Sequence, residues 1–271
     1  MVTVKTKIWI SAGVFMLSGV QVDLSNNDGA SPTFSYASAS AKTSNGEGGE
    51  GGEGGESGEK KLSATQRKIE YLKNMTLVEG HLIAGVELYR AGAIDAARSH
   101  MKHPKDELYR KLEGGLKEFR GAGFAESLKR LGAAVDQKRP IAEVDEALKK
   151  VTFDIDTARA KAKPDPKTSM LVISQVMRVA ADEYGAGVKD GKIVDAHEYQ
   201  DAYGFFMASK RIVSNIKSAS SANKPTIEQA GQLLKEQENA WQSLTGETSG
   251  KPDASSLHAV ASKIELAASS L

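Results

Sequence analysis

The sequence contains no cysteine, and this absence narrows its chemistry before any motif is considered. Without thiols the chain cannot form disulfides, thiolate metal sites, Fe–S clusters or a covalent c-type haem linkage, and it has no cysteine to carry a lipid. Aromatic residues are also few, at 6% of 271 residues, whereas Ala, Leu, Lys and Glu are plentiful. This composition favours helices over β-sandwiches, which use β-branched and aromatic residues.

A strong excess of charge of either sign is lacking as well, because the formal net charge is +1 at pH 7. The broad basic field that attracts nucleic acid is therefore absent, and we expect no nucleic-acid partner. The sequence also has no Gly-x-Ser-x-Gly elbow and no dinucleotide or phosphate-cradling glycine motif between a strand and a helix. These absences predict a protein that is not an enzyme.

One markedly apolar run occurs, near the N-terminus, and it is shorter than a usual membrane span. Lys5 and Lys7 precede this run, residues 8–20, and small residues at 37–41 offer cleavage motifs. This pattern is typical of a signal peptide over residues 1–41; an uncleaved N-terminal anchor is the alternative. In both cases we expect the body to lie outside the cytoplasm, in the periplasm, with peripheral membrane contact or none.

The next region, residues 42–61, is rich in glycine and glutamate. Between residues 46 and 59, Glu recurs at every third position on a glycine background. Glycine disfavours a helix and the spaced charges repel one another, so this region is expected to be a disordered, flexible linker. Weak collection of cations is an alternative role for it.

From Leu62 onward, apolar residues recur every three or four positions, which is the spacing of a buried helical stripe. The prolines of Pro164-Asp165-Pro166 interrupt this pattern. We therefore predict an all-α fold, a helical bundle in two packed subdomains, residues 62–163 and 166–271. Helices are expected over 62–90, 94–101, 104–120, 124–139, 141–162, 168–188 and 195–218, with further helices after Pro225 and Pro252.

Three of the five histidines fall within residues 81–103. His100 and His103 are three positions apart, so both can reach one ion or one haem, and a helix hairpin can bring His81 near them. Imidazoles with nearby carboxylates suit iron, zinc, copper or manganese better than calcium. The alternatives are that these histidines only cover helix ends, or that one of them binds haem or copper together with a methionine such as Met101.

A second polar group surrounds a predicted helix–turn–helix over residues 182–201. Asp182 and Glu183 precede the turn, which contains Asp190, and Glu198 opens the following helix beside His197 and Asp201 in an antiparallel hairpin. Carboxylates gathered between helices form the cation sites of many bundles. Helix capping by Asp195, with Glu198 completing a capping box, explains the same polarity without a site.

The same stretch resembles, over residues 170–210, the extracytoplasmic helical region of bacterial high-affinity iron permeases. The matching residues are Asp182, Tyr184, Val188, Asp190, Gly191, Ile193, Glu198 and Tyr199. Residues 85–113 are faintly similar to imelysin-like periplasmic iron-uptake proteins, although that group's Gly-x-His-x-x-Glu site is not reproduced after Gly80. Because the permease's membrane helices are missing here, the resemblance implies a companion of a permease.

These patterns together predict a non-enzymatic, exported metal-binding protein that serves iron uptake or handling. Its metal ion is expected to be iron, with copper, zinc or haem as alternatives, and its partner a membrane iron permease or another inner-membrane protein. A structural or partner-binding bundle without metal is the competing interpretation. The predicted ligands, in one site or two, are His81, His100, His103, Asp182, Glu183, Asp190 and Glu198.

Overall fold

Helices dominate the computed structural model, which describes residues 62–104, 108–216, 221–251 and 253–271 and leaves the side chain of His103 undescribed. The predicted signal peptide and linker lie outside the described residues. The N-terminal helices are α1 (Ala64–Arg90), α2 (Ile94–His103), α3 (Tyr109–Phe119), α4 (Ala125–Asp136) and α5 (Ile141–Lys161). The C-terminal helices are α6 (Pro166–Gly187), α7 (Ala196–Asn215), α8 (Lys224–Lys235) and α9 (Ala254–Ala268). The predicted all-α fold is confirmed.

Three elements between these helices are very short. Strands β1 (Val188–Lys189) and β2 (Lys192–Ile193) form an antiparallel hairpin between α6 and α7, and a 3-10 helix, Glu238–Ala240, follows α8. Positive φ angles of 51° at Asp190 and 73° at Gly191 close the hairpin, as the predicted turn requires.

Local sequence signals account for most helix limits. Asp165 caps α6 by accepting a hydrogen bond of 2.6 Å from the backbone N–H of Thr168, and Pro166 occupies the first turn, where its missing N–H does no harm. Asp195 caps α7 in the same way, as predicted. Pro104 follows α2 as its C-cap with helical dihedral angles, and α3 begins at Tyr109 beyond residues that lie outside the described structure. That Pro104 opens the next helix stays a prediction.

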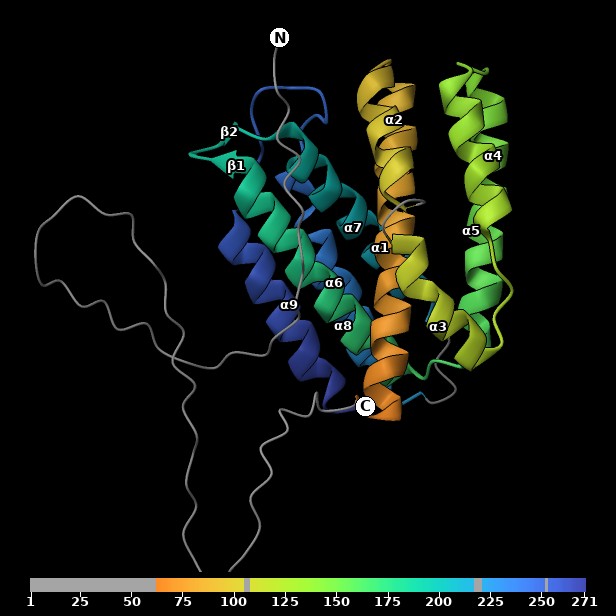
Figure 1. Ribbon diagram of the computed structural model, residues 1–271. Coiled ribbons are helices and arrows are strands. Elements are labelled where there is room, and N and C mark those ends of the chain that lie inside the picture. Colours follow the sequence, from red (N-terminus) through yellow and green to blue (C-terminus); the bar gives the residue numbers. More distant parts are fainter. Residues whose placement is uncertain (1–61, 105–107, 217–220, 252) are drawn as a thin grey trace, which may run out of the picture. The chain divides into compact units, whose positions relative to one another are not determined.

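The hydrophobic core consists of two clusters of buried side chains. One lies among α6–α9 and includes Tyr184, Tyr199 and Phe206. The other lies among α1–α5 and extends onto α6 and α7 through residues such as Val176 and Phe205. Helix α1 packs against α2, α5, α6 and α7, and Figure 1 shows it between α5 on one side and α6 on the other. It is buried on several faces rather than along one stripe, as a central helix must be.

The helices α1–α9 belong to one compact unit. The chain turns between α5 and α6 at Pro164-Asp165-Pro166, where the sequence predicts a division. Because α1 contacts both α5 and α6, the two predicted subdomains share a helix interface. The division into two subdomains stays a prediction.

A glycine pair allows α1 and α7 to approach closely. A Cβ on Gly80 would lie 2.5 Å from Phe205 Cδ1, and a Cβ on Gly204 would lie 2.2 Å from the carbonyl oxygen of Gly80. Any larger side chain at either position would therefore push the helices apart. Gly80 precedes His81 directly, and Gly204 lies one helical turn after Asp201, so this contact fixes the spacing of two polar side chains.

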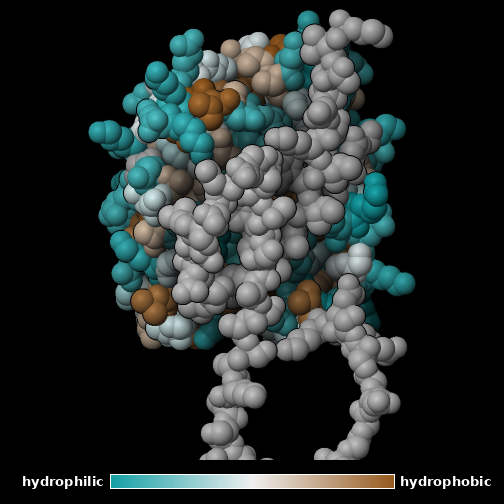
Figure 2. Space-filling view, turned by 60° about the vertical axis from the view of Figure 1, so that its left-hand side comes forward, coloured by the Kyte–Doolittle hydropathy of each residue, from teal (hydrophilic) through white to brown (hydrophobic). Residues whose placement is uncertain are grey.

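Hydrophilic side chains cover most of the described surface visible in Figure 2, with hydrophobic patches scattered among them. Large exposed apolar residues include Phe153 of α5, Val194 between β2 and α7, and Leu266 of α9. Among the residues with a described structure, no helix is both long enough and apolar enough to span a bilayer.

Candidate metal centre

Three polar side chains from three helices meet in the interior. His81 of α1 and His100 of α2 place their Nδ1 atoms 2.6 Å and 2.9 Å from the same oxygen, Oδ1 of Asp201 on α7. The exposed fractions of these residues are 6%, 0% and 4%. One ligand atom from each lies within 4.8 Å of the other two, which is the arrangement of donors around a single ion.

Gln200 determines which nitrogen of His100 carries a proton. Its Nε2 amide donates a hydrogen bond to the carbonyl oxygen of Leu244 at 2.9 Å, so its Oε1 is the atom that faces His100 Nε2 at 3.0 Å. An amide oxygen only accepts, and His100 Nε2 must therefore donate. In a neutral imidazole this leaves Nδ1 as an unprotonated lone-pair donor facing Asp201.

The contact between His100 Nδ1 and Asp201 Oδ1 is short but poorly aligned for a hydrogen bond. Both atoms are fully buried, and within the described part of the chain neither has a hydrogen bond of acceptable geometry. A lone pair and a carboxylate oxygen 2.9 Å apart repel one another unless positive charge lies near both. A metal ion bound to both atoms would provide that charge. A proton on Nδ1 would also provide it, but its N–H bond would have to point at the carboxylate oxygen to form a good hydrogen bond.

The charge state of Asp201 follows from the same neighbours. Burial alone would raise the pKa of its carboxyl group, but positive charge on the imidazoles of His81 and His100 outweighs burial and holds the pKa well below its usual range. A cation bound at the same nitrogens would act in the same direction and keep Asp201 ionised.

A half-buried polar group continues from the centre toward the surface. His197 stacks on His100 with ring centroids 4.4 Å apart, and its Nε2 lies 3.4 Å from Oδ2 of Asp201. Glu183 of α6 is hydrogen-bonded to Glu198 of α7. Burial first, and then the nearby carboxylates, raise the pKa of Glu183 to about 9, so this pair retains a proton at neutral pH.

The structure brings together only some of the ligands predicted from sequence. His81 and His100 converge on Asp201, and Glu183 and Glu198 face one another beside them. These residues belong to one continuous polar region, although the sequence placed them in two groups.

The remaining predicted ligands lie elsewhere or are undescribed. Asp182 is exposed and forms an ion pair of 3.2 Å with His258 of α9. Asp190 occupies the exposed hairpin turn. The side chain of His103 lies outside the described structure, and Met101, the suggested haem or copper partner, packs its terminal methyl group over Gly85 of α1.

Asp201 and Gln200 are the site residues that sequence reasoning did not include among the ligands. Asp201 follows His197 by four positions, which puts both on one face of a helix. That spacing was an available signal for Asp201. Gln200 offered none, because its role depends on contacts with His100 and Leu244 that are distant in the sequence.

A second buried polar network links α1, α5 and α7. Glu79 is fully buried and accepts hydrogen bonds from Arg159 and Arg211, and both arginines also contact Asp156. Burial would lower the pKa of Arg211, but its bonds to Asp156 and Glu79 outweigh burial and raise the pKa above its usual value. This network joins helices and contains no metal-ligand arrangement in the described residues.

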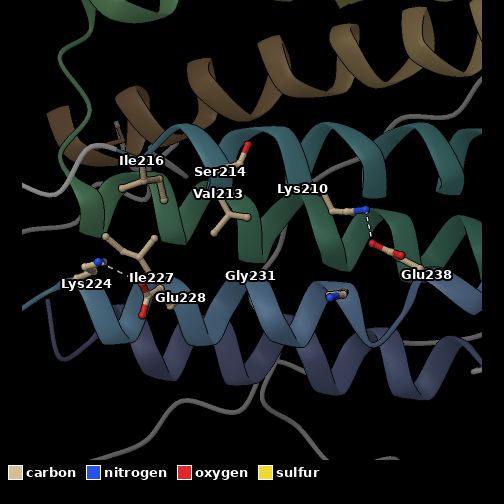
Figure 3. A pocket seen from close by; sticks show the side chains of 10 residues that line it. Lys210, Val213, Ser214, Ile216, Lys224, Ile227, Glu228, Gly231 and Glu238 are labelled. Carbon is tan, nitrogen blue, oxygen red and sulfur yellow. Dashed lines mark hydrogen bonds and ion pairs between the residues drawn. The ribbon is translucent and has the colours of Figure 1, made fainter.

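A groove of about 590 Å³ lies between α7 and α8, away from the histidines (Figure 3). Val213, Ile216 and Ile227 contribute its apolar lining, and the ion pair between Lys210 and Glu238 stands at one end. At 1.5 Å per residue, its lining on α7 begins about 14 Å along the helix from Asp201. The groove is therefore separate from the polar region.

Comparison with known proteins finds a family match for the C-terminal helices. Residues 159–271 match the family model of the iron permease-associated 4-helix bundle domain, and the match covers α6–α9 from the end of α5. The predicted resemblance of residues 170–210 to this region is confirmed. No curated protein and no solved structure matches the chain. The imelysin-like similarity of residues 85–113 stays a prediction.

The match relates the C-terminal helices to a domain that is associated with iron permeases, which suggests a role related to iron uptake. The match includes only one of the three clustered residues: Asp201 lies within the matched segment, whereas His81 and His100 precede it. The bundle thus contributes the carboxylate, and the N-terminal helices contribute the imidazoles.

Proposed function

We propose that this chain is an exported, non-enzymatic accessory of iron uptake that binds one metal ion between His81, His100 and Asp201. Iron is the expected ion, and the expected partner is an iron permease of the inner membrane. Glu183, Glu198 and His197 lie beside the ligands and line the side from which an ion would arrive. The sequence similarity to a permease-associated bundle supports the role, and the three-donor geometry supports the binding.

The contact between His100 and Asp201 is the observation that carries this proposal. Gln200 directs the Nδ1 lone pair of His100 toward a buried carboxylate with which it makes no well-aligned hydrogen bond. A buried polar contact of this kind is costly unless a cation completes it. Binding should weaken as the pH falls below about 6, because the histidines must be unprotonated to coordinate.

The permease association supports the proposed compartment and the proposed partner. A bundle that accompanies an iron permease works where iron is collected before transport, which agrees with the predicted signal peptide and periplasmic location. The chain would deliver its ion to the permease.

The test is the metal content of protein purified from the periplasm, followed by titration of the apo protein with iron, copper, zinc and manganese. Asp201→Asn should lose the bound ion, because a neutral amide replaces the only anionic donor. Asp182→Asn is the matched control, since Asp182 is exposed and paired with His258.

Retention of the ion by Asp201→Asn would contradict the proposed ligands. Absence of any binding to the wild type would instead favour the structural bundle, in which a protonated histidine pair neutralises Asp201. The two variants should have equal helix content by circular dichroism, so that a loss of binding reports the ligand and not the fold.

A further inference from the structure

We infer that the centre accepts divalent cations and excludes trivalent ones, so that it carries iron as Fe(II) and not as Fe(III). This inference rests on the proposed function, because it specifies the ion for the same three residues.

The donor set is two imidazole nitrogens and one carboxylate oxygen, from His81, His100 and Asp201. Two histidines and one carboxylate with open positions are the ligands of non-haem Fe(II), and imidazole suits divalent iron, zinc and copper. A hard trivalent ion is better served by several anionic oxygens. Only one such oxygen ligand is present among these three residues.

The small number of carboxylates around the centre favours the ion of lower charge. Asp201 is the only carboxylate among the three proposed ligands. A trivalent cation would therefore leave more uncompensated positive charge in this buried region than a divalent cation. With His81, His100 and Asp201 almost completely buried, that extra charge is strongly unfavourable.

The nearby tyrosines do not supply phenolate, the anionic oxygen that would compensate a trivalent ion. Tyr184 and Tyr199 are buried in the hydrophobic cluster of α6–α9, with ring centroids 5.8 Å apart. The hydroxyl group of Tyr184 donates hydrogen bonds to the carbonyl oxygens of Ala240 and Gly250, at 3.2 and 3.3 Å. Both tyrosines pack as core residues.

The number of ligands also favours exchange over permanent retention. Three protein donors leave further coordination positions of a divalent ion open to water. His197 is stacked against His100 and is partly exposed, so the open side lies near the surface rather than in the core. An ion held in this way can be passed on, as the proposed accessory role requires.

The experiment compares Co(II), a coloured divalent ion, with Ga(III), a trivalent ion that cannot be reduced under these conditions. The full chain without metal is titrated with Co(II) citrate, and its visible absorption is recorded. Fe(II) under anaerobic conditions and Ga(III) citrate are then added separately as competitors. Asp201→Asn and Asp182→Asn are measured alongside as the ligand variant and its control.

We expect one equivalent of Co(II) to bind, Fe(II) to displace it, and Ga(III) at tenfold excess to displace less than a tenth of it. The absorption should disappear in Asp201→Asn and persist in Asp182→Asn. Displacement by Ga(III) at comparable concentration would overturn the divalent inference and leave the proposed metal binding intact. Failure of every ion to bind the wild type would overturn both.

Discussion

The N-terminal helices α1–α5 and the C-terminal helices α6–α9 differ in how they form a core. The C-terminal helices surround a hydrophobic cluster of their own, whereas the N-terminal cluster includes side chains of α6 and α7 such as Val176 and Phe205. The matched family domain coincides with the C-terminal helices. The core of the N-terminal helices is therefore completed by side chains of the bundle, whereas the cluster within the bundle contains no side chain of α1–α5 among the described residues.

The two regions also differ in what they contribute to the polar interior. The bundle supplies Asp201, Glu183 and Glu198, whereas α1 and α2 supply His81 and His100. A bundle with these carboxylates alone would offer a different donor set. In this chain, α1 and α2 add two imidazoles to the carboxylates of the bundle, so the proposed ion would have nitrogen as well as oxygen donors.

The largest expected effect comes from breaking the ionic link between the regions. Glu79→Gln should lower the free energy of unfolding by about 3–5 kcal/mol, because Arg159 and Arg211 would then lack the buried carboxylate with which both pair. Chemical denaturation measures this. Glu143→Gln on the exposed surface of α5 is the control and should change stability by less than about 1 kcal/mol. Equal losses in both variants would mean that the link contributes no more than a surface pair.

A smaller loss is expected from separating α1 and α7 sterically. Gly204→Ala should cost about 1–3 kcal/mol and weaken metal binding, since its Cβ would overlap the backbone of Gly80. Gly231→Ala in α8 has no atom within 4 Å of the added Cβ and should be neutral or stabilising. Denaturation and metal titration of both variants test this difference. If Gly204→Ala keeps the stability and metal affinity of the wild type, α1 and α7 can move apart without consequence.

The orientation of a ligand by the other region can be tested at Gln200. Gln200→Leu removes the acceptor for His100 Nε2, and loss of such an orienting contact typically lowers metal affinity about 10–100-fold. Gln232→Leu, at an exposed position of α8, should leave affinity unchanged. Isothermal titration of folded protein provides the measurement. If both variants bind with wild-type affinity, Gln200 does not set the tautomer of His100.

The smallest expected effect lies at the junction of the regions. Asp165→Ala removes the cap of α6 and should cost about 1 kcal/mol at pH 7. The backbone N–H of Thr168 holds the pKa of Asp165 below its ordinary value of 3.8. The stabilisation is therefore complete above that value and is lost as the pH falls through the lower pKa of the folded state. Thermal unfolding at pH 7 and pH 2.5 should show the difference between variant and wild type shrinking in acid.

Helix limits could be predicted because proline, glycine and capping residues act over a few positions. Asp165 and Asp195 start helices in the structure as their sequence neighbours indicate. Pro104 shows how little a proline alone decides, because its fixed φ is compatible with the cap at the end of α2 as well as with the first turn of a helix.

The centre could be predicted only in part, because helix rotation decides which neighbour faces inward. Asp182 and Glu183 are adjacent, so their directions differ by about 100° around the helix axis. Tertiary packing turns Glu183 toward Glu198 and Asp182 toward His258. The pairing of His100 with Asp201 likewise depends on α1, α2 and α7 packing together, which local periodicity does not encode.

The close contact of Gly80 with Gly204 also affects the order of events in biosynthesis. A growing chain contains His81 and His100 well before Asp201 has been made, so early intermediates carry scattered imidazoles without their shared carboxylate. The three donors come together only when α7 has docked on α1 at this glycine pair. An ion encountered during translation would thus find no complete binding pocket, and loading would belong to the last stage of maturation.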